Sequence, residues 1–248
     1  SISFESIPTI SMNQFLAGTA GQKSTVISGS LILPNKVEKP VPAVVILHGQ
    51  GGVHRNEKDW ASRLRRIGIA TFIVNSNKRP DCRKGTCYDS HQGMVNIVDA
   101  YRALDLLSTQ PLIESTQIAV MGFSVGGKAS LYSSVNRFQQ LWGASEYEFA
   151  AFVSFYPGCN IRFDKDEDVS NKPIRVFHGA QDEWSSPSVC KEYIELLIAA
   201  GNDAEITIYD KAHHGFDSKP EQGAPTTVSS TFHVNCRFEE DSQIGEIV

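Results

Sequence analysis

A serine between glycines is the residue of this 248-residue sequence whose surroundings most suggest chemistry. Ser124 lies in "MGFSVGGKAS" (121–130), between an apolar run and a segment compatible with a helix. The glycines of a G-x-S-x-G pattern permit a sharp strand-to-helix turn, from which the serine hydroxyl projects above a sheet. A glycine-rich turn without chemistry would show the same letters, so a nucleophile can be inferred only if the serine has partners.

Candidate partners follow Ser124 along the chain. A serine hydroxyl is a poor nucleophile unless a base removes its proton. Asp182 comes just after one apolar run, and His213 and His214 come just after the next. Serine, acid and histidine occur in that order in α/β-hydrolases. Asp182 could instead be a turn residue or a helix cap, and the position of the two histidines alone leaves both of them as candidates for the base.

Acyl transfer also needs donors that stabilise the negative charge on the substrate oxygen, and backbone amides usually supply them. The segment "VVILHGQGGV" (44–53) places a glycine-rich loop directly after an apolar run. We assign the backbone amides of Gln50 and Val125 as the oxyanion donors. The chemistry indicated is nucleophilic attack by Ser124 on a carbonyl carbon.

The elements that must position these residues alternate along the chain. Continuous apolar runs predict strands that are buried on both faces, whereas 26–33 alternates like a half-exposed strand. The predicted strands are 26–33, 43–48, 69–75, 117–122, 150–156, 174–178 and 204–209. Apolar residues at helical spacing predict helices over 91–108 and 188–200, and a shorter one after Asn56 as N-cap. The alternation predicts an α/β fold with a mainly parallel central sheet and helices on both faces.

Five segments together resemble the dienelactone hydrolase family of the α/β-hydrolase superfamily, over roughly residues 26–217. They are "PAVVILHGQGG", "IAVMGFSVGG", "FYPGC", "FHGAQDEWSSP" and "YDKAHHGFD". The resemblance implies an α/β-hydrolase fold, with Ser124 as nucleophile, Asp182 as acid and His214, which precedes Gly215 and Phe216, as base. It also supports Gln50 and Val125 as oxyanion donors.

One departure from the family is the nucleophile, because the namesake enzymes use cysteine where this chain has Ser124. A neutral hydroxyl needs full general-base help that a thiolate does not. This difference disfavours the namesake substrate and favours ordinary carboxylic esters.

Residues 1–217 are predicted to form the hydrolase domain, and 218–248 an extension or a truncated end of the same domain. Members of the superfamily usually follow the histidine with a final helix. Residues 218–248 show no strong helical pattern, although "FHVNCRFEE" (232–240) resembles a strand.

Composition excludes several classes of function. The net charge is −5, and basic residues do not gather in runs, so nucleic-acid binding is not expected. No apolar stretch approaches the roughly 20 residues of a membrane span. The chemistry requires no metal or organic cofactor, and the spacing of Cys82 and Cys87, with no second cysteine pair downstream, disfavours zinc.

Five cysteines are compatible with disulfides or with reduced thiols. Cys159 and Cys190 lie near the same edge of the predicted sheet and are a candidate pair, as are Cys82 and Cys87, leaving Cys236. Two disulfides would imply an oxidising compartment. Together with a first residue that is not methionine, they favour a secreted or periplasmic protein, with the cytoplasm as the alternative.

Other polar residues near the predicted strand ends have less specific roles. His48 and His178 each precede a glycine and are interpreted as hydrogen-bonding neighbours of the site. Trp184, Glu183 and Arg79 could reach a substrate or could lie in solvated loops.

These observations predict a serine hydrolase that cleaves carboxylic esters, with lactones as a further option, through a Ser-His-Asp triad and an acyl-enzyme. The expected partner is a small-molecule ester, and the oligomeric state is not predicted. Two alternatives remain: an amide or peptide hydrolase that uses the same triad, and a binding protein that keeps the fold without the activity.

Overall fold

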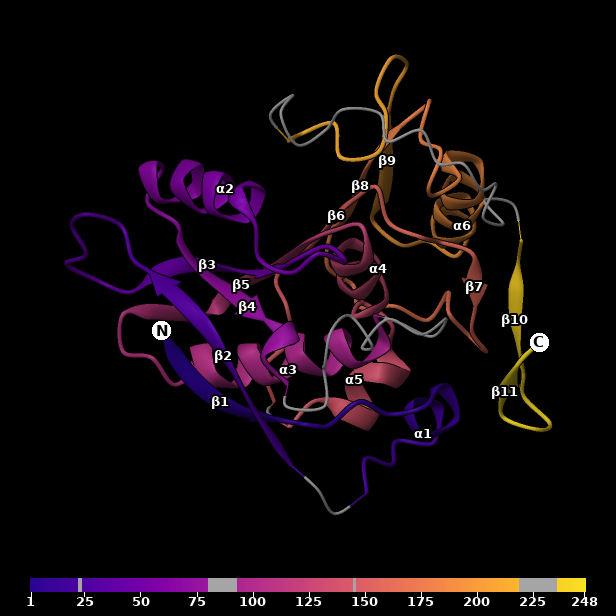
Figure 1. The fold of residues 1–248 in the computed structure, drawn as a ribbon, viewed down its shortest axis with the longest axis horizontal. Coiled ribbons are helices and arrows are strands. Elements are labelled where there is room, and N and C mark those ends of the chain that lie inside the picture. Colours follow the sequence, from indigo (N-terminus) through magenta and orange to yellow (C-terminus); the bar gives the residue numbers. More distant parts are fainter. Residues whose placement is uncertain (22–23, 80–92, 145, 219–235) are drawn as a thin grey trace.

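The computed structural model describes residues 1–21, 24–79, 93–144, 146–218 and 236–248, and these build an α/β fold around one large sheet (Figure 1). The strands of this sheet are β1 (Ile2–Ser6), β2 (Thr25–Ile32), β3 (Val41–Leu47), β4 (Ala70–Asn75), β5 (Ile113–Phe123), β6 (Phe152–Phe155), β8 (Ile174–Gly179) and β9 (Ala204–Tyr209). Their spatial order is β1-β2-β4-β3-β5-β6-β8-β9. β2 runs antiparallel to β1 and β4, and the other neighbouring strands of this sheet are parallel, so the predicted mainly parallel sheet is confirmed.

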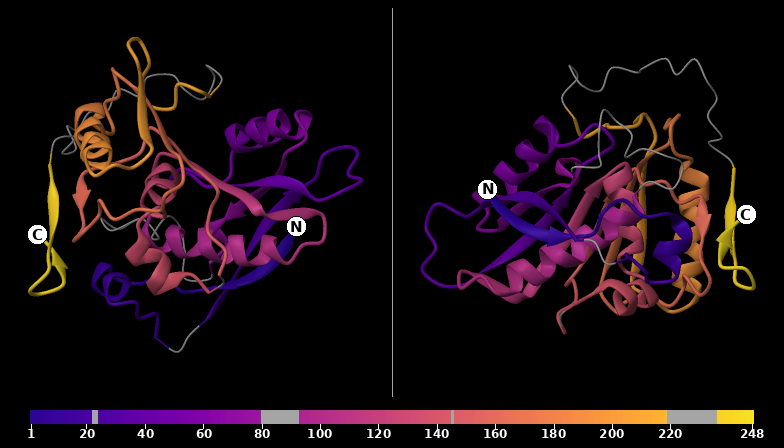
Figure 2. Two further views of the ribbon diagram at one scale, coloured as in Figure 1. Left: turned by 180° about the vertical axis from the view of Figure 1, so that it is seen from behind. Right: turned by 60° about the horizontal axis from the view of Figure 1, so that its bottom comes forward.

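Helices cover both faces of the sheet, as predicted (Figures 1 and 2). They are α1 (Met12–Leu16), α2 (Arg55–Arg66), α3 (Met94–Ser108), α4 (Val125–Tyr132), α5 (Asn136–Trp142) and α6 (Pro187–Ala199), with a 3-10 turn η1 (Ser76–Lys78) after β4. The apolar side chains of α2 belong to one core cluster, and those of α3–α6 to the other. β3 serves both, since Val44 and Ile46 face α2 while Val45 and Leu47 face the larger cluster. A strand buried on two faces reads as a continuous apolar run.

The start of α2 corrects one sequence prediction. Asn56 is not the N-cap, because the helix begins at Arg55, two residues earlier than predicted, and His54 is its N-cap. The backbone N–H of His54 donates to the Glu57 carboxylate over 2.8 Å, which satisfies a donor at the helix start. Asn56 lies inside the first turn, and its side chain donates to Asp217 instead.

Residues at the C-terminal end pack against the domain as a small second sheet. β10 (Phe238–Asp241) pairs with β11 (Glu246–Ile247) and with β7 (Ile161–Arg162), and the hairpin stands beside β7 in Figure 2. Arg137 of α5 binds both carboxylate oxygens of Glu240, each over 2.8 Å. The described part of the predicted extension therefore contacts the domain at β7 and α5.

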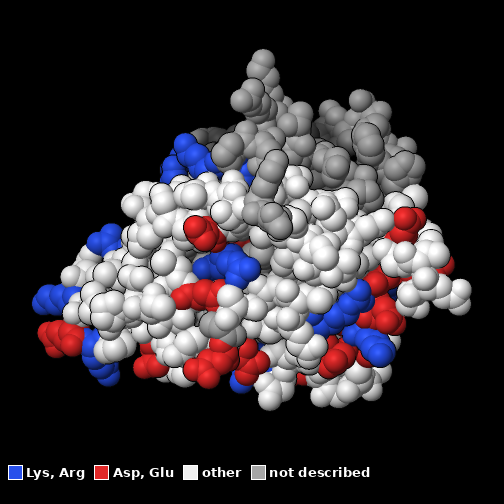
Figure 3. Space-filling view, turned by 90° about the horizontal axis from the view of Figure 1, so that it is seen from below, with Lys and Arg blue, Asp and Glu red and all other residues white. Residues whose placement is uncertain are grey.

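Charged side chains of both signs lie on the surface (Figure 3). On the part of the face in Figure 3 that the described residues form, acidic and basic side chains are interspersed without a broad basic patch. Within the described ranges, no helix is both long and apolar enough to cross a membrane.

Candidate active site

Ser124 occupies a backbone conformation that its neighbours impose. It lies between β5 and α4 with φ 54° and ψ −114°, a left-handed conformation that L-residues rarely adopt. The turn is so tight that a Cβ on Gly122 would lie 1.9 Å from the Gly126 carbonyl oxygen. A Cβ on Gly126 would lie 2.4 Å from the Leu47 carbonyl oxygen of β3. Glycine is therefore required at both positions, and main-chain packing fixes where the serine lies.

A chain of hydrogen bonds joins three residues that follow three parallel strands. His214 Nε2 lies 2.9 Å from Ser124 Oγ, and His214 Nδ1 lies 2.8 Å from Asp182 Oδ2. Ser124 follows β5, Asp182 follows β8 and His214 follows β9, so the carboxyl ends of these strands converge on one point. His213 points elsewhere, with Nδ1 2.7 Å from Glu183 Oε1. Of the two histidines, His214 is the one that the fold brings to the serine.

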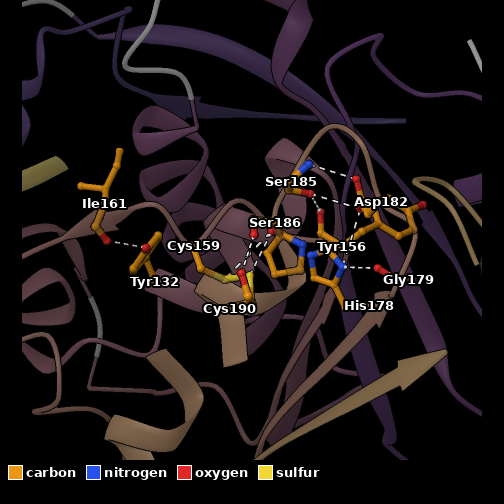
Figure 4. Close-up of a disulfide and its surroundings, with 12 residues drawn as sticks. Tyr132, Tyr156, Cys159, Ile161, His178, Gly179, Asp182, Ser185, Ser186 and Cys190 are labelled. Atoms are coloured by element: carbon orange, nitrogen blue, oxygen red, sulfur yellow. Dashed lines mark hydrogen bonds and ion pairs between the residues drawn. A yellow bond between two sulfur atoms is a disulfide. The ribbon is translucent and has the colours of Figure 1, made fainter. Parts of the chain in front are cut away.

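The Asp182 carboxylate is held by more than the histidine (Figure 4). Its Oδ1 accepts the backbone N–H groups of Trp184 and Ser185 over 2.8 and 2.9 Å. Its Oδ2 accepts the Ser185 hydroxyl over 3.2 Å. Burial by itself would raise the pKa of Asp182, but the bond to His214 and the two amides outweigh burial and leave the pKa below its ordinary value. Asp182 is therefore a fixed carboxylate that can orient an imidazole.

Ser124 and His214 open into a cavity of about 480 Å³. Its lining consists of Gly49, Gln50, Gly51, His54, Asn56, Glu57, Phe123, Ser124, Tyr156, Trp184, His214, Gly215 and Ser218. Gln50 thus shares the cavity with Ser124, and Val125 is the first residue of α4. Trp184 is 51% exposed at the cavity and stacks on His214, with ring centroids 6.0 Å apart. A small molecule that entered the cavity would meet the serine, the histidine and this indole together.

The two other strand-end histidines are buried beside the site. His48 Nδ1 donates to the Gly49 carbonyl over 2.7 Å, and Nε2 accepts the Ser76 N–H over 3.2 Å. His178 Nδ1 lies 3.7 Å from Asp182 Oδ2, beneath the acid. Burial lowers the pKa of both imidazoles, which favours their neutral forms. His48 supports the loop that carries Gln50, in line with its predicted hydrogen-bonding role.

Arg79 does not reach the cavity, and both of its predicted roles are wrong. Its guanidinium is 1% exposed and forms an ion pair with the fully buried Asp99 of α3. It also donates to the Ile7 carbonyl over 2.9 Å. A charge can remain buried when it is paired and hydrogen-bonded in this way, so Arg79 is part of the core.

Cys159 and Cys190 form the predicted disulfide, with Cα atoms 4.9 Å apart (Figure 4). It connects the loop after β6 to α6, close to Asp182 and Ser185. The other candidate pair, Cys82 and Cys87, lies outside the described residues.

Three polar residues of the site were not singled out in the sequence. Ser185 holds the acid, and Tyr156 packs its ring on His214, with centroids 4.6 Å apart. Asp217 accepts hydrogen bonds from Asn56, Trp60 and Tyr156. For Asp217 the available signal was its position three residues after His214. Among the residues that the structure describes, no three His, Cys, Asp or Glu side chains gather as a metal site.

Comparison with known sequences identifies relatives along most of the chain. The profile of the dienelactone hydrolase family matches residues 27–233. A candidate carboxymethylenebutenolidase from Yersinia pestis is 27% identical over 206 aligned residues, which cover 75% of this chain and 72% of the relative.

Solved structures with the same fold are more distant in sequence. A candidate dienelactone hydrolase from Klebsiella pneumoniae is 16% identical, with a TM-score of 0.62 over 87% of this chain and 89% of its own. A dienelactone hydrolase-like promiscuous phosphotriesterase from metagenomic libraries is 20% identical, with a TM-score of 0.62 over 90% and 87%. A propionate-bound esterase from Thermogutta terrifontis is 17% identical, with a TM-score of 0.58 over 78% and 81%. At these identities the likeness establishes the α/β-hydrolase fold.

Proposed function

The chain belongs to the dienelactone hydrolase family and is a hydrolase, and from this premise we propose that it cleaves carboxylic esters with Ser124 as the nucleophile. The observation that carries the proposal is the hydrogen-bonded chain Ser124–His214–Asp182 at the wall of the cavity. Serine and histidine within 2.6–3.2 Å, with a third group orienting the base, are the mark of an activated nucleophile.

In the first half of the reaction, Ser124 Oγ attacks the ester carbonyl carbon while His214 Nε2 takes its proton. The imidazolium that forms is stabilised by Asp182 through Nδ1. The negative charge on the former carbonyl oxygen is stabilised by the backbone N–H groups of Gln50 and Val125. His214 then gives its proton to the alcohol oxygen as the carbon–oxygen bond breaks, which leaves the acyl group on Ser124.

In the second half, water replaces the alcohol. A water molecule attacks the acyl carbon while His214 takes a proton from this water. His214 then returns the proton to Ser124 Oγ as the carboxylic acid product leaves. The neutral serine requires this general-base help at both stages, because a hydroxyl is not ionised as a thiol can be. We therefore assign ordinary carboxylic esters as the preferred substrates, with lactones next.

The names of similar proteins support the ester class. One solved neighbour is an esterase, and others carry the name of dienelactone hydrolases. The amide alternative uses the same residues, and matched p-nitrophenyl and p-nitroanilide derivatives of one acyl group distinguish the two. If the anilide were hydrolysed faster than the ester, amide hydrolysis would replace ester hydrolysis as the proposed function.

A fluorophosphonate probe tests the nucleophile without knowledge of the substrate. We expect one adduct in the intact mass of the folded protein, located on Ser124 by peptide mapping, and none in Ser124→Ala. Acid-unfolded protein provides the control for nonspecific reaction. An adduct elsewhere, or no adduct in folded protein, would reject the mechanism and favour a binding protein with this fold.

The proposed location is an oxidising compartment outside the cytoplasm. The support is the Cys159–Cys190 disulfide, since disulfides form and persist mainly in such compartments. Trapping free thiols with an alkylating agent in intact cells, followed by peptide mass analysis, tests this: alkylated Cys159 and Cys190 would contradict it.

A further inference from the structure

A second carboxylate, that of Asp217, lies close in the sequence to the proposed base. Asp217 follows His214 by three residues in the loop after β9, residues 210–218, which we call the histidine loop. Its Oδ1 accepts the Tyr156 hydroxyl over 2.6 Å, and its Oδ2 accepts Trp60 Nε1 over 2.6 Å and Asn56 Nδ2 over 3.0 Å. One side chain therefore connects the histidine loop to two other parts of the fold.

The donors come from elements that are anchored independently of the loop. Asn56 and Trp60 belong to α2, and Trp60 also packs on Phe155 of β6, with ring centroids 5.1 Å apart. Tyr156 is buried in the loop after β6. Hydrogen bonds to an ionised acceptor are shorter and stronger than neutral ones. The Asp217 carboxylate can therefore hold the loop against both anchors.

Tyr156 also links Asp217 directly to the base. Its ring packs on the His214 imidazole at 4.6 Å, while its hydroxyl is bonded to Asp217. The conformation of Tyr156 is uncommon, with φ 38°, so its orientation is fixed by these surroundings. Burial and the charge of Asp217 raise the pKa of Tyr156, which keeps the hydroxyl protonated as a donor.

The main chain of the histidine loop makes few hydrogen bonds to other parts of the fold, so side chains must hold the loop in place. The N–H of Ala212 donates to the carbonyl of Tyr209 at the end of β9, and the N–H of Ser218 donates to that of Gly215 within the loop. Two bonds connect the main chain of the loop to Gln181, on the acid side of His214: its N–H donates to the Ala212 carbonyl, and its Nε2 donates to the Asp210 carbonyl over 3.3 Å. Beyond the histidine, the polar attachments that the structure gives run from Asp217 to Tyr156, Trp60 and Asn56.

We propose that Asp217 is a positioning residue, which holds His214 in line with Ser124 by connecting the histidine loop to α2 and to Tyr156. The inference rests on the proposed function, in which His214 is the base. A misplacement of about 1 Å in a reacting group can reduce turnover by about a hundredfold. Asp182 orients the imidazole through Nδ1, whereas Asp217 fixes the main chain that carries it.

The test compares Asp217→Asn with Asp210→Asn, which removes the same charge from an exposed position in the same connection. The rate is measured on an activated ester and expressed per serine that reacts with the fluorophosphonate probe, so that unfolded molecules are not counted. We expect Asp217→Asn to lower kcat by about tenfold to a hundredfold with KM changed less than about threefold, and to slow phosphonylation of Ser124. Asp210→Asn should match the wild-type protein.

Tyr156→Phe provides a second, nearly isosteric test in case Asp217→Asn fails to fold. It removes one donor to Asp217 and keeps the ring on His214, and we expect a smaller fall in kcat in the same direction. A residue that only stabilised the fold would lower the melting temperature and leave kcat per reactive serine unchanged. That result for either variant would overturn the inference while leaving the esterase proposal intact. Absence of turnover and of a Ser124 adduct in the wild-type protein would overturn both.

Discussion

The two sides of the proposed active site are built in different ways. On one side, Ser124 is held by main-chain packing: glycines at 122 and 126 bring β5, α4 and β3 into contact. On the other side, His214 is held by side chains, through Asp182, Asp217 and the ring of Tyr156. The nucleophile is therefore fixed locally, whereas the base depends on residues that are distant in the sequence.

This difference separates two kinds of sensitivity to mutation. Where main-chain contacts hold the residue, as for Ser124, there is no room for an additional atom. Even one added methyl group should therefore disrupt the turn. Where side-chain contacts hold the residue, as for His214, one substitution removes one contact. Each such substitution should therefore lower activity or stability only in part. Matched substitutions on the two sides can test the distinction.

Replacement of the reacting groups should have the largest effects. Ser124→Ala should lower kcat for an activated ester by about a millionfold, because no nucleophile remains. Asp182→Asn should lower it by about ten-thousandfold, because the base keeps its place but loses its orienting carboxylate. Steady-state kinetics with circular dichroism as the folding control measure both. An Asp182→Asn variant as active as the wild-type protein would contradict the assigned acid.

Gly126→Ala and Gly215→Ala compare the two sides at their glycines. The new Cβ at 126 would lie 2.4 Å from a main-chain oxygen, so we expect about 3 kcal/mol of destabilisation and loss of esterase activity. At Gly215, φ is 74° and the space around the new Cβ is open, so strain should cost about 1 kcal/mol and activity should largely remain.

Urea unfolding and kcat measured on both variants decide this comparison. Equal destabilisation by the two substitutions would remove the proposed contrast between main-chain and side-chain construction.

The disulfide is a further side-chain contact in the part of the site that holds Asp182 and His214. Cys159 and Cys190 are separated by 31 residues, a loop for which closure contributes about 3–4 kcal/mol. We expect the double alanine variant to lose about that much of its unfolding free energy in urea under oxidising conditions. Under reducing conditions, wild-type and variant proteins should unfold at similar urea concentrations. A difference that persists after reduction would show that packing of the sulfur atoms, and not the covalent link, is responsible.

The smallest expected effect concerns His178, the buried histidine next to Asp182. The pKa of His178 is lowered in the folded protein by burial, so the unfolded chain binds a proton first as the pH falls. The stability that neutral His178 contributes is fully present above about pH 6.5 and is lost as the pH falls from there through its lowered folded pKa. The slope is at most about 1.4 kcal/mol per pH unit.

His178→Asn should flatten this dependence. Unfolding free energies of the two proteins from pH 7.5 to pH 5 measure the effect, and parallel curves would exclude His178 as its source.

The turn that carries Ser124, which main-chain contacts hold, is also the part of the site that could best be predicted from the sequence. Ser124 and its glycines could be located because a backbone requirement restricts the residue type at each position. The buried strands were predicted for a similar reason, since a two-sided sheet requires runs such as 43–48. The short α1 was missed although Ser11 and Gln14 form a capping box that is visible in the letters.

Side-chain attachments could not be predicted in the same way. Asp217 receives its donors from residues 56, 60 and 156, and no local pattern records that meeting. Arg79 was misjudged because its partner Asp99 lies 20 residues away in α3, where a charge on a mainly apolar buried face was the available signal. Such pairs become apparent only when the fold brings the elements together.

The place of β9 in the sheet has a consequence for how the protein loses activity. Among the strands that the structure describes, β9 lies at the edge of the large sheet with β8 as its one neighbour, and the loop that follows β9 carries His214. Native proteins open in parts, and weakly supported edges open at lower free energy than the centre of a sheet. Detachment of this one strand would remove the base while β3, β5 and Ser124 remain folded. Inactivation by heat or denaturant would then precede global unfolding, and amide hydrogens of β9 would exchange with solvent sooner than those of β5.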